Sequence, residues 1–397
     1  MRILLTDGSG LTARQTASRL GAAGHLVEVL APDPLCLCRF TRHVHRVRRV
    51  PTYGPDPSRW LDAALEIYEA GHFDVLFPTQ EQVAVLAAFP ERLRDSGVAT
   101  AVPPFSALAA VQDKLSAFGT LTRLGVPQPF TAARAEGWTQ FPAYVKEPIG
   151  TASGGVRRVT SPKELTDATL GKNVLVQAAA YGPLAMCQSV FDNGSLVAFH
   201  ANLRTAMGTN GGSSHKRSMD LPEARRWLEL LGSNLGWHGA LSADVIVTDA
   251  GPLFIDVNPR LVEPENAWRA GVDLVGAMLH VACRASPPRQ PDGRAGVGTH
   301  QLLLAVLGAA QQGGGRRRVL KELLAAGRHS GLYAGSAEEL TPGRHDPTAL
   351  VPVVMASVAT LIRPTSWSWF SSGSVENYAL TAEGWEQILV GSAGPTR

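Results

Sequence analysis

Four residues that could act together in chemistry stand in two apolar, strand-like runs of this 397-residue chain: Asp244, Asp256, Asn258 and Arg260. The turn Asp249–Gly251 between the runs predicts a β-hairpin. Because side chains alternate between the two faces of a strand, the hairpin would place Asp244 beside Asp256. Two carboxylates and an amide oxygen suit Mg²⁺, which also takes phosphate oxygens as ligands. Arg260 would stabilise negative charge on a transferred phosphoryl group.

The same aspartates would also fit ordinary solvent-exposed strand positions. Asp and Asn are depleted in strands, however, so their presence among Val, Ile and Phe weakens that interpretation, although the hairpin taken alone still favours it over a metal site.

A glycine-rich segment, Gly150-Thr151-Ala152-Ser153-Gly154-Gly155, follows a strand-like run that ends at Lys146. Glycines let backbone N–H groups approach phosphate oxygens, and a neighbouring lysine adds positive charge. The segment is not a Walker A loop, because no Gly-Lys-Ser/Thr follows it. Taken alone, the segment favours a flexible hairpin connection over a phosphate-binding loop.

The elements that position these residues change in type along the chain. Up to about residue 112, strand-like runs such as Ile3–Leu5 and Leu26–Leu30 alternate with helical stretches such as Thr12–Ala23. This alternation predicts βαβ units and a parallel sheet. After a helix over Lys114–Leu124, short strands joined by turns such as Asp192–Gly194 predict antiparallel and mixed sheets. From about 286 to 298 a linker is expected before further helices.

The order of these features resembles the ATP-grasp superfamily, and within it the carboxylate–amine ligases. The features are Asp113-Lys114 at a helix start, a Val-Pro-x-Pro break, the strand ending at Lys146, the glycine-rich segment, Leu175-Val-Gln177, the acidic hairpin and Asp256-Val-Asn-Pro-Arg260. The resemblance covers roughly residues 1–285, and its last run is the most specific part.

The resemblance implies an α/β and α+β fold in three parts. A Rossmann-like domain that precedes the ATP-grasp domain would span residues 1–112. The ATP-grasp domain would span 113–290, with a small lobe at about 113–180 and a large lobe at about 181–290. Residues 291–397 would form a helical and mixed extension that helps to enclose the substrate.

The resemblance also implies residue roles in an enzyme that joins a small acid to an amine at the expense of ATP, through an acyl-phosphate. Lys114 and Lys146 would contact the phosphates, and residues 150–155 would fold over them. The adenine site would be lined by Gln177, Ala178, Ala179 and Ala180. Mg²⁺, with Mn²⁺ as an alternative, would be held by Asp244, Asp256 and Asn258. Arg260 would stabilise the acyl-phosphate. The chain has Ala178 and Leu184 where the family usually has glutamates that hold adenine and ribose.

Two further basic residues, Arg204 and Lys216, flank the polar, glycine-containing stretch 208–215. The composition suits a mobile loop that closes over phosphates or a substrate carboxylate. We therefore expect both side chains to contact anions, although a solvated loop fits equally well.

Other functions remain open on the sequence alone. Gly8-Ser-Gly10-Leu-Thr-Ala13 after a strand, with Glu28 at the end of the next, fits a dinucleotide-binding motif and hence an NAD-dependent oxidoreductase. Two other ATP-dependent reactions are alternatives: phosphorylation of bicarbonate and a cyclisation. A nucleotide-binding module without turnover is a further alternative. The basic run Arg39–Arg49 lacks interleaved aromatic residues and fits a solvated face.

Composition excludes several classes of protein. A net charge of +3 gives no strong field toward nucleic acid or an anionic membrane, and four cysteines do not suggest a disulfide framework. The apolar run Leu350–Ile362 is too short to span a membrane and predicts a buried strand or helix. No signal peptide is apparent. We therefore expect a cytoplasmic protein with small-molecule carboxylate and amine substrates, without nucleic-acid or membrane partners, and we allow for a homodimer.

Overall fold

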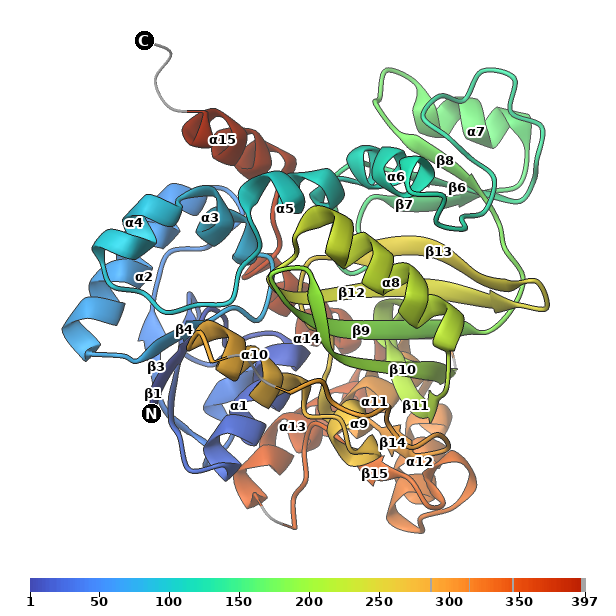
Figure 1. Ribbon diagram of the computed structural model, residues 1–397. Coiled ribbons are helices and arrows are strands. Elements are labelled where there is room, and N and C mark those ends of the chain that lie inside the picture. The colour runs from blue at the N-terminus through green and yellow to red at the C-terminus, as the bar shows by residue number, and fades with distance from the viewer. Residues whose placement is uncertain (286–287, 314, 345, 394–397) are drawn as a thin grey trace.

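The computed structural model describes residues 1–285, 288–313, 315–344 and 346–393. The chain begins with a four-stranded parallel sheet in the order β3-β2-β1-β4 (Figure 1). Its strands are β1 (Arg2–Leu5), β2 (Leu26–Ala31), β3 (Val44–Arg49) and β4 (Val75–Phe77). The predicted parallel sheet is confirmed, with the addition of β3, a basic strand at the sheet edge. Charged side chains are common on edge strands, because they discourage pairing with another chain.

Helices cover both faces of this sheet. Helices α1 (Leu11–Ala22) and α10 (Leu274–Ala282) pack on the face of Ile3 and Leu5. The opposite face, which includes Leu4, packs against α2 (Pro57–Gly71), α3 (Val83–Ala88) and the last helix, α15 (Ala382–Ser392). Helices α4 (Pro90–Asp95) and α5 (Phe105–Gln112) complete this part of the chain.

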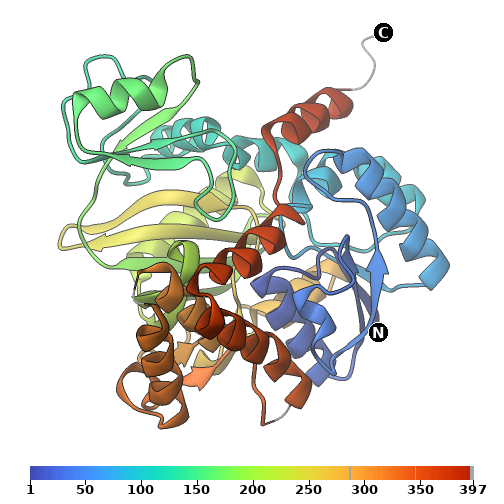
Figure 2. The ribbon, with the colours of Figure 1, turned by 180° about the vertical axis from the view of Figure 1, so that it is seen from behind.

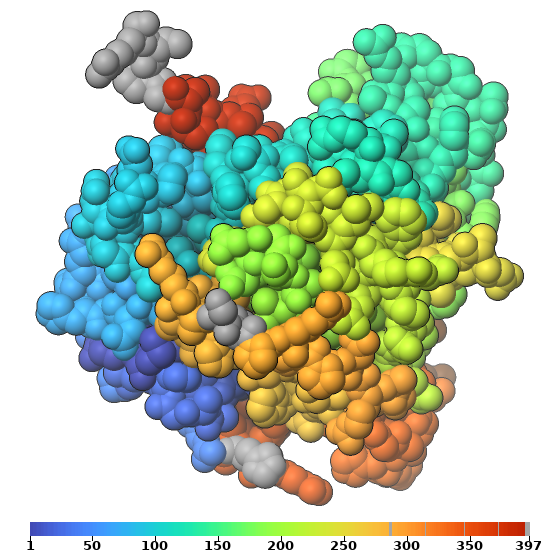
Figure 3. All heavy atoms as spheres, viewed as in Figure 1, coloured from blue at the N-terminus to red at the C-terminus, as the bar shows by residue number. Residues whose placement is uncertain are grey.

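A small lobe follows and projects from the rest of the molecule (Figure 3). Helix α6 (Lys114–Arg123) leads into a four-stranded antiparallel sheet with the order β5-β8-β6-β7. The strands are β5 (Thr131–Ala132), β6 (Ala143–Lys146), β7 (Val156–Val159) and β8 (Leu175–Ala178), and α7 (Pro162–Thr169) packs on them. The glycine-rich segment connects β6 to β7, so it forms a hairpin tip.

The large lobe is a seven-stranded sheet in the order β13-β12-β9-β10-β11-β14-β15. Its strands are β9 (Leu184–Asp192), β10 (Ser195–Met207), β11 (Ser213–Met219), β12 (Gly239–Thr248), β13 (Gly251–Asn258), β14 (Gly298–His300) and β15 (Ala337–Glu338). One face packs against α8 (Pro222–Leu235) through Phe191, Leu228 and Trp237. Along the central strands, polar side chains alternate onto the other face.

The C-terminal extension packs against both earlier parts. Strands β14 and β15 lengthen the large-lobe sheet, while α11 (Leu302–Gln311), α12 (Gly315–Gly327), α13 (Leu350–Ile362) and α14 (Trp367–Glu376) form a helical layer beside it. The chain then passes between the sheet and the N-terminal domain to α15 (Figure 2). Of the predicted linker, residues 286 and 287 lie outside the described residues. The boundaries near residues 112 and 290 stay a prediction.

Candidate active site

The acidic hairpin forms as the alternation of its residues predicts. Strand β13 pairs antiparallel with β12, and Asp256 lies directly opposite Asp244. Asn258 lies opposite Ser242 on the same pair of strands, two positions further along. Because residues two apart share a face, both aspartates and Asn258 are presented on one side of the sheet.

A β-bulge lies beside the aspartate pair. The register shifts after Asp244, so that Val245 pairs with Phe254 and Ile255 is the extra residue. A bulge residue is left out of the regular ladder of backbone hydrogen bonds. The carbonyl oxygen of Ile255 instead accepts a hydrogen bond of 2.6 Å from Lys146 Nζ, which arrives from the small lobe. The bulge therefore joins the end of β6 to the acidic hairpin.

The charges at this junction influence one another. Burial raises the pKa of Asp244 to about 7; the negative charge of Asp256 adds to this, and Arg260, Lys146 and Arg204 oppose it. Burial lowers the pKa of Lys146, which is 6% exposed, while the two aspartates counteract that effect. Two adjacent, buried carboxylates form a setting that a divalent cation would stabilise.

Arg260 is held at the end of β13 by the loop that follows Pro259. Its backbone N–H donates to Asn258 O at 2.8 Å, and its own carbonyl oxygen accepts a 2.7 Å hydrogen bond from Ser242 Oγ. The side chain reaches the N-terminal domain, where Arg260 Nε donates to Glu81 Oε1 at 3.3 Å. Gln112 Nε2 donates to the second oxygen of Glu81, also at 3.3 Å. The arginine thus bridges two parts of the chain.

The glycine-rich segment lies close to the large lobe. Ala152, Ser153 and Gly155 have φ values of 51°, 66° and 70°, which accounts for the choice of glycine at the last of them. A Cβ atom on Gly150 would lie 2.2 Å from Gly154 O, so that position excludes side chains. A Cβ atom on Gly211 would lie 3.7 Å from Ser153 Oγ. The tip of the small-lobe hairpin therefore approaches the loop after β10.

Lys114 and Arg204 each donate a hydrogen bond to a backbone carbonyl group of one of these two loops. Lys114, in the first turn of α6, donates from Nζ to Gly150 O at 3.2 Å. Arg204 Nη1 donates to Gly211 O at 2.7 Å. The structure thus brings Lys146, Arg204 and Arg260 around the aspartate pair, and it places Lys114 near Lys146 and in contact with residues 150–155.

The predicted adenine-binding residues lie at the end of β8, where the small lobe passes into the large one. Gln177 is buried, and its Nε2 donates to Thr131 Oγ1 at 3.2 Å. The backbone N–H groups of Ala178 and Ala179 already donate within the small lobe, to Phe130 O and Pro142 O. Ala180 follows these two residues in the connection to β9. These contacts hold the connection in place.

Lys216 has a different setting from the one expected. It is fully buried and makes ion pairs with Glu263 and, at 2.6 Å, with Glu339. Burial opposes the charge of Lys216, but the two carboxylates outweigh it and raise the pKa of the lysine. Gln301 and Gln15 donate hydrogen bonds to Glu263 and Glu339 respectively. The geometry makes Lys216 part of a buried cluster with two carboxylates, and its predicted contact with a substrate anion stays a prediction.

The dinucleotide-binding alternative receives little support from its own residues. Glu28, which would hold a ribose, is 1% exposed and pairs with Arg48 at 2.5 Å and with Arg2 at 3.4 Å. Gly10 lies against Gln80: a Cβ atom on Gly10 would be 2.1 Å from Gln80 Nε2. The side chain of Gln80 therefore occupies the space beside the glycine turn.

Sequence reasoning missed two residues near Arg260. Glu81 follows β4, and the loops at the carboxyl ends of parallel strands are where α/β sheets usually bind ligands. That rule could have drawn attention to Glu81. Tyr378 comes from the segment after α14 and is 9% exposed; burial raises the pKa of its phenol, an effect that Arg260 opposes and Asp7 and Glu81 reinforce. Nothing in the local sequence identifies Tyr378.

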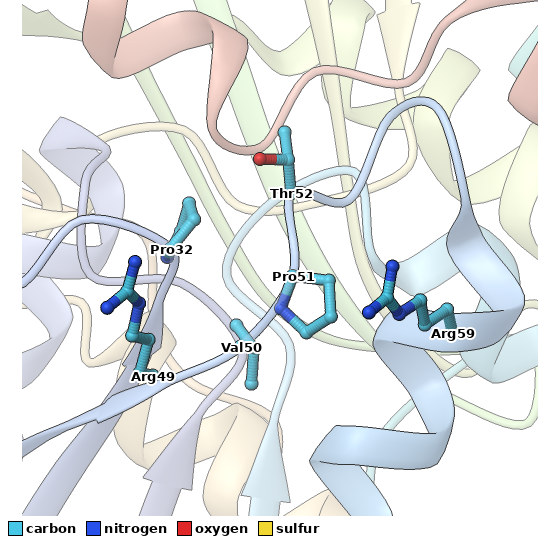
Figure 4. Close-up of a pocket in the computed structure, with 6 residues that line it drawn as sticks. All are labelled: Pro32, Arg49, Val50, Pro51, Thr52 and Arg59. Atoms are coloured by element: carbon cyan, nitrogen blue, oxygen red, sulfur yellow. The ribbon is translucent and has the colours of Figure 1, made fainter.

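A separate shallow pocket of about 560 Å³ lies beyond the carboxyl ends of β2 and β3 (Figure 4). The guanidinium groups of Arg49 and Arg59 flank it, with Pro51 between them. Its lining consists of Pro32, Arg49, Val50, Pro51, Thr52 and Arg59, and so includes no residue of the acidic hairpin.

Among the described residues, no group of three or more His, Cys, Asp and Glu could hold a metal. A metal at the hairpin would therefore need Asn258 or a ligand to complete its coordination. No helix in the described part of the chain is long and apolar enough to cross a membrane.

Comparison with known proteins identifies the domain that carries the hairpin. Residues 111–264 match the family model of the ATP-grasp domain. No curated protein matches the sequence.

Solved structures of similar fold cover most of the chain. The biotin carboxylase domain of Hydrogenobacter thermophilus 2-oxoglutarate carboxylase, solved as a dimer with MgADP, ADP and bicarbonate, aligns with a TM-score of 0.57 and 15% identity over 75% of this chain and 73% of that one. The L-amino acid ligase of Bacillus licheniformis aligns with a TM-score of 0.54 and 16% identity, over 71% of this chain and 73% of that one. The N5-carboxyaminoimidazole synthetase of Staphylococcus aureus aligns with a TM-score of 0.57 and 13% identity, over 76% of this chain and 82% of that one. Residues 111–264 thus form an ATP-grasp domain, and most of the chain shares the fold of these solved structures.

Proposed function

We propose that this protein is an ATP-dependent carboxylate–amine ligase that forms an amide bond through an acyl-phosphate. The observation that carries the proposal is the direct pairing of Asp244 with Asp256, with Lys146 bound to the bulge beside them. The ATP-grasp domain at residues 111–264 and the ligase among the structures of similar fold support it.

The residues present suit Mg²⁺ and ATP phosphates. Asp244, Asp256 and Asn258 would supply oxygen ligands, and phosphate oxygens would complete the coordination. A bound Mg²⁺ would offset the charge of the phosphates and of the two aspartates. The raised pKa of Asp244 reflects burial beside a like charge, a cost that a divalent cation removes.

The protein's own groups would act mainly by position and charge. Lys146 and Lys114 would hold the phosphate chain, and residues 150–155 would cover it and exclude water. Arg260 would stabilise the charge that develops when a substrate carboxylate oxygen attacks the γ-phosphorus and the bond to ADP breaks. The amine would then attack the acyl carbon, form the amide and release phosphate and a proton.

Adenosine binding would depend on fewer side chains than is usual in the family. Ala178 and Leu184 replace the usual glutamates, and the N–H groups of Ala178 and Ala179 are engaged within the small lobe. Adenine would therefore contact the remaining backbone of the connection and the buried Gln177. We infer that contacts to the phosphates, more than contacts to the adenosine, supply most of the affinity for ATP.

The test is an ADP-release screen with mixtures of amino acids and other small acids, with and without amines. ADP formation that requires both partners, together with the mass of an amide product, is the expected result. ADP release with bicarbonate alone would indicate that the enzyme phosphorylates bicarbonate and does not join an acid to an amine. The carboxylase structure suggests this alternative function. Absence of Mg²⁺-dependent ATP binding in calorimetry would overturn the whole proposal, and enhanced NADH fluorescence would favour the oxidoreductase.

Small-molecule partners and a homodimer also form part of the proposal. The carboxylase domain of similar fold was solved as a dimer.

A further inference from the structure

The carboxyl ends of β1 and β4 meet where the first sheet changes direction. Strand β2 lies on one side of β1 and β4 lies on the other, so the sheet extends both ways from β1. Open α/β sheets usually bind ligands outside the carboxyl ends of the strands at such a switch point. Thr79 N donates to Thr6 Oγ1 at 3.0 Å and ties the two strand ends together. Asp7, which follows β1, and Gln80, which follows β4, therefore stand where a ligand is expected.

Asp7 is a buried carboxylate without an ion pair. It is 1% exposed, and its two oxygens accept hydrogen bonds from the backbone, from Ser9 N at 2.9 Å and from Gly10 N at 2.6 Å. No basic side chain of the described residues forms a salt bridge with it. Burial raises the pKa of Asp7 to about 6, although the backbone hydrogen bonds and the more distant charge of Arg260 oppose the shift. A cationic ligand group would compensate this buried charge.

The side-chain amide of Gln80 lies beside Asp7. A Cβ atom on Gly10 would lie 2.1 Å from Gln80 Nε2 and 3.0 Å from Asp7 Oδ2, so both groups flank this glycine. Gln80 is 2% exposed, and its amide makes no hydrogen bond with the described residues. Buried amides are normally paired, because an unpaired one costs free energy. The amide oxygen of Gln80 is therefore a second acceptor that a ligand could use.

Tyr378 reaches the same region from the segment between α14 and α15, which crosses the molecule (Figure 2). Its neighbour Asn377 fixes the segment to the turn after β1, because Asn377 Nδ2 donates to Ser9 Oγ at 3.0 Å. Tyr378 is 9% exposed, and its hydroxyl group has no hydrogen-bond partner in the described part of the chain. Burial raises the pKa of the phenol, so the hydroxyl group keeps its proton. Its oxygen is then a neutral third acceptor.

The charges near Tyr378 favour a cationic ligand group over an anionic one. Three carboxylates and one guanidinium group act on its phenol, namely those of Asp7, Glu81, Glu263 and Arg260. Glu81 and Glu263 already have cationic partners, whereas Asp7 has none among the described residues. A protonated amine would add the missing positive charge, and its N–H groups would donate to acceptors that are otherwise unpaired.

We propose that Asp7, Gln80 and Tyr378 form a subsite for the ammonium group of the amine substrate, with Tyr378 supplied by the C-terminal extension. The proposal rests on the ligase function proposed above and adds that the amine binds in its protonated form. A primary ammonium group has three N–H donors, one for each acceptor. The charge of Arg260 acts on Asp7 as well as on Asp244, so the subsite and the acidic hairpin lie within reach of the same arginine.

The test is calorimetric titration of the full-length protein in the presence of Mg-ADP. The probes are the common amino acids and simple primary amines, each titrated separately. The wild type is expected to bind at least one probe and not the N-acetylated form of that probe, which lacks the ammonium group. Tyr378→Phe should raise the Kd for the probe at least about 10-fold, the usual effect of losing a hydrogen bond to a charged group. Asp7→Asn, which removes the opposite charge, should raise it at least about 100-fold.

Tyr333→Phe is the matched control for Tyr378→Phe. It also removes a phenol hydroxyl group from a buried tyrosine of the C-terminal extension, but this group donates to Glu322 Oε1 at 2.9 Å. Tyr333→Phe should therefore lower Tm and leave the Kd for the probe unchanged. Tyr378→Phe breaks no hydrogen bond within the described chain, so it should leave Tm unchanged while it weakens binding. A merely structural role of the Tyr378 hydroxyl group would give the opposite result.

Four outcomes would overturn the proposal. They are binding of no probe to the wild type, equal binding of the N-acetylated form, a wild-type Kd in Tyr378→Phe, and a fall in Tm of Tyr378→Phe as large as that of Tyr333→Phe. If Asp7→Asn fails to fold, Tyr378→Phe decides alone.

Failure of the ligase function gives a different pattern. A probe that binds through Tyr378 but supports no ADP release with any acid would contradict the ligase and retain the subsite. ADP release that requires an amine, with an unchanged KM for that amine in Tyr378→Phe, would retain the ligase and contradict the subsite.

Discussion

Arg260 and Glu81 are 179 positions apart in sequence, yet Arg260 Nε and Glu81 Oε1 lie 3.3 Å apart, and both side chains are largely buried. The pair connects the end of the acidic hairpin to the loop after β4. An arginine that must meet a developing negative charge benefits from a fixed orientation. Glu81 provides that orientation, and Gln112 holds Glu81 in turn.

We therefore expect Glu81→Gln to lower turnover about 10-fold while the Kd for Mg-ATP changes less than about twofold, since the change weakens the alignment of Arg260 and spares the phosphate contacts. Arg260→Ala should abolish turnover with folding retained. Steady-state ADP release and calorimetry would be compared for the two variants. Wild-type turnover in Glu81→Gln would show that Arg260 needs no such partner.

Removing one carboxylate of the hairpin should act on the metal. Asp256→Asn keeps the shape of the side chain and its neighbours on β13 but removes the charge beside Asp244. The variant should lose Mg²⁺-dependent ATP binding by at least about 10-fold and most of its turnover. Titration of ATP at several Mg²⁺ concentrations measures this effect. Asp249→Asn, at the exposed turn of the same hairpin, is the control and should behave as the wild type.

Lys216 should prove essential for stability. Lys216→Met leaves Glu263 and Glu339 buried beside each other without a cation, which costs about 3–5 kcal/mol in comparable buried pairs. Lys172→Met removes the exposed pair with Glu147 and should cost less than about 1 kcal/mol. Urea unfolding of the two variants gives the comparison. A stable Lys216→Met protein that lacks only activity would return Lys216 to the role of a substrate contact.

The buried His200 should make stability depend on pH. Burial lowers the pKa of His200 to about 4, from 6.5, although its hydrogen bond with Asn266 opposes the shift. The unfolded chain therefore takes up this proton first as the pH falls below 6.5, and stability is lost between pH 6.5 and 4. The contribution amounts to about 2 kcal/mol between pH 7.5 and 5. In His200→Gln, the loss of unfolding free energy over this interval should be smaller by that amount; an unchanged loss would mean that other groups account for it.

The sequence predicts well those parts of the site whose geometry is local. The alternation of Asp244 and Asp256 with apolar neighbours, and the turn between their strands, were enough to predict which side chains lie side by side. The bulge at Ile255 was not predictable in this way, because it depends on how two particular strands pair. Its carbonyl oxygen nevertheless provides the contact to Lys146.

Tertiary packing decides the rest. Lys216 looked like a loop cation, but its partners are 47 and 123 residues away, and only the folded chain brings them together. The basic composition of Val44–Arg49 gave no sign of a strand, because an edge strand buries little and can carry charges. Tyr378 reaches the surroundings of Arg260 only through the return of the C-terminal segment across the molecule (Figure 2).

The placement of α15 has a consequence for synthesis on the ribosome. Leu380, Trp385 and Ile388 fill the core beneath α2 and α3, next to residues made some three hundred positions earlier. Domains usually fold in order as the chain emerges. Here the first sheet must wait with one apolar face incompletely covered until the last helix has been translated. Deletion of α15 should therefore affect the yield of soluble protein more strongly than its distance from the acidic hairpin suggests, and nascent chains that stall before Leu380 are the forms most in need of chaperones.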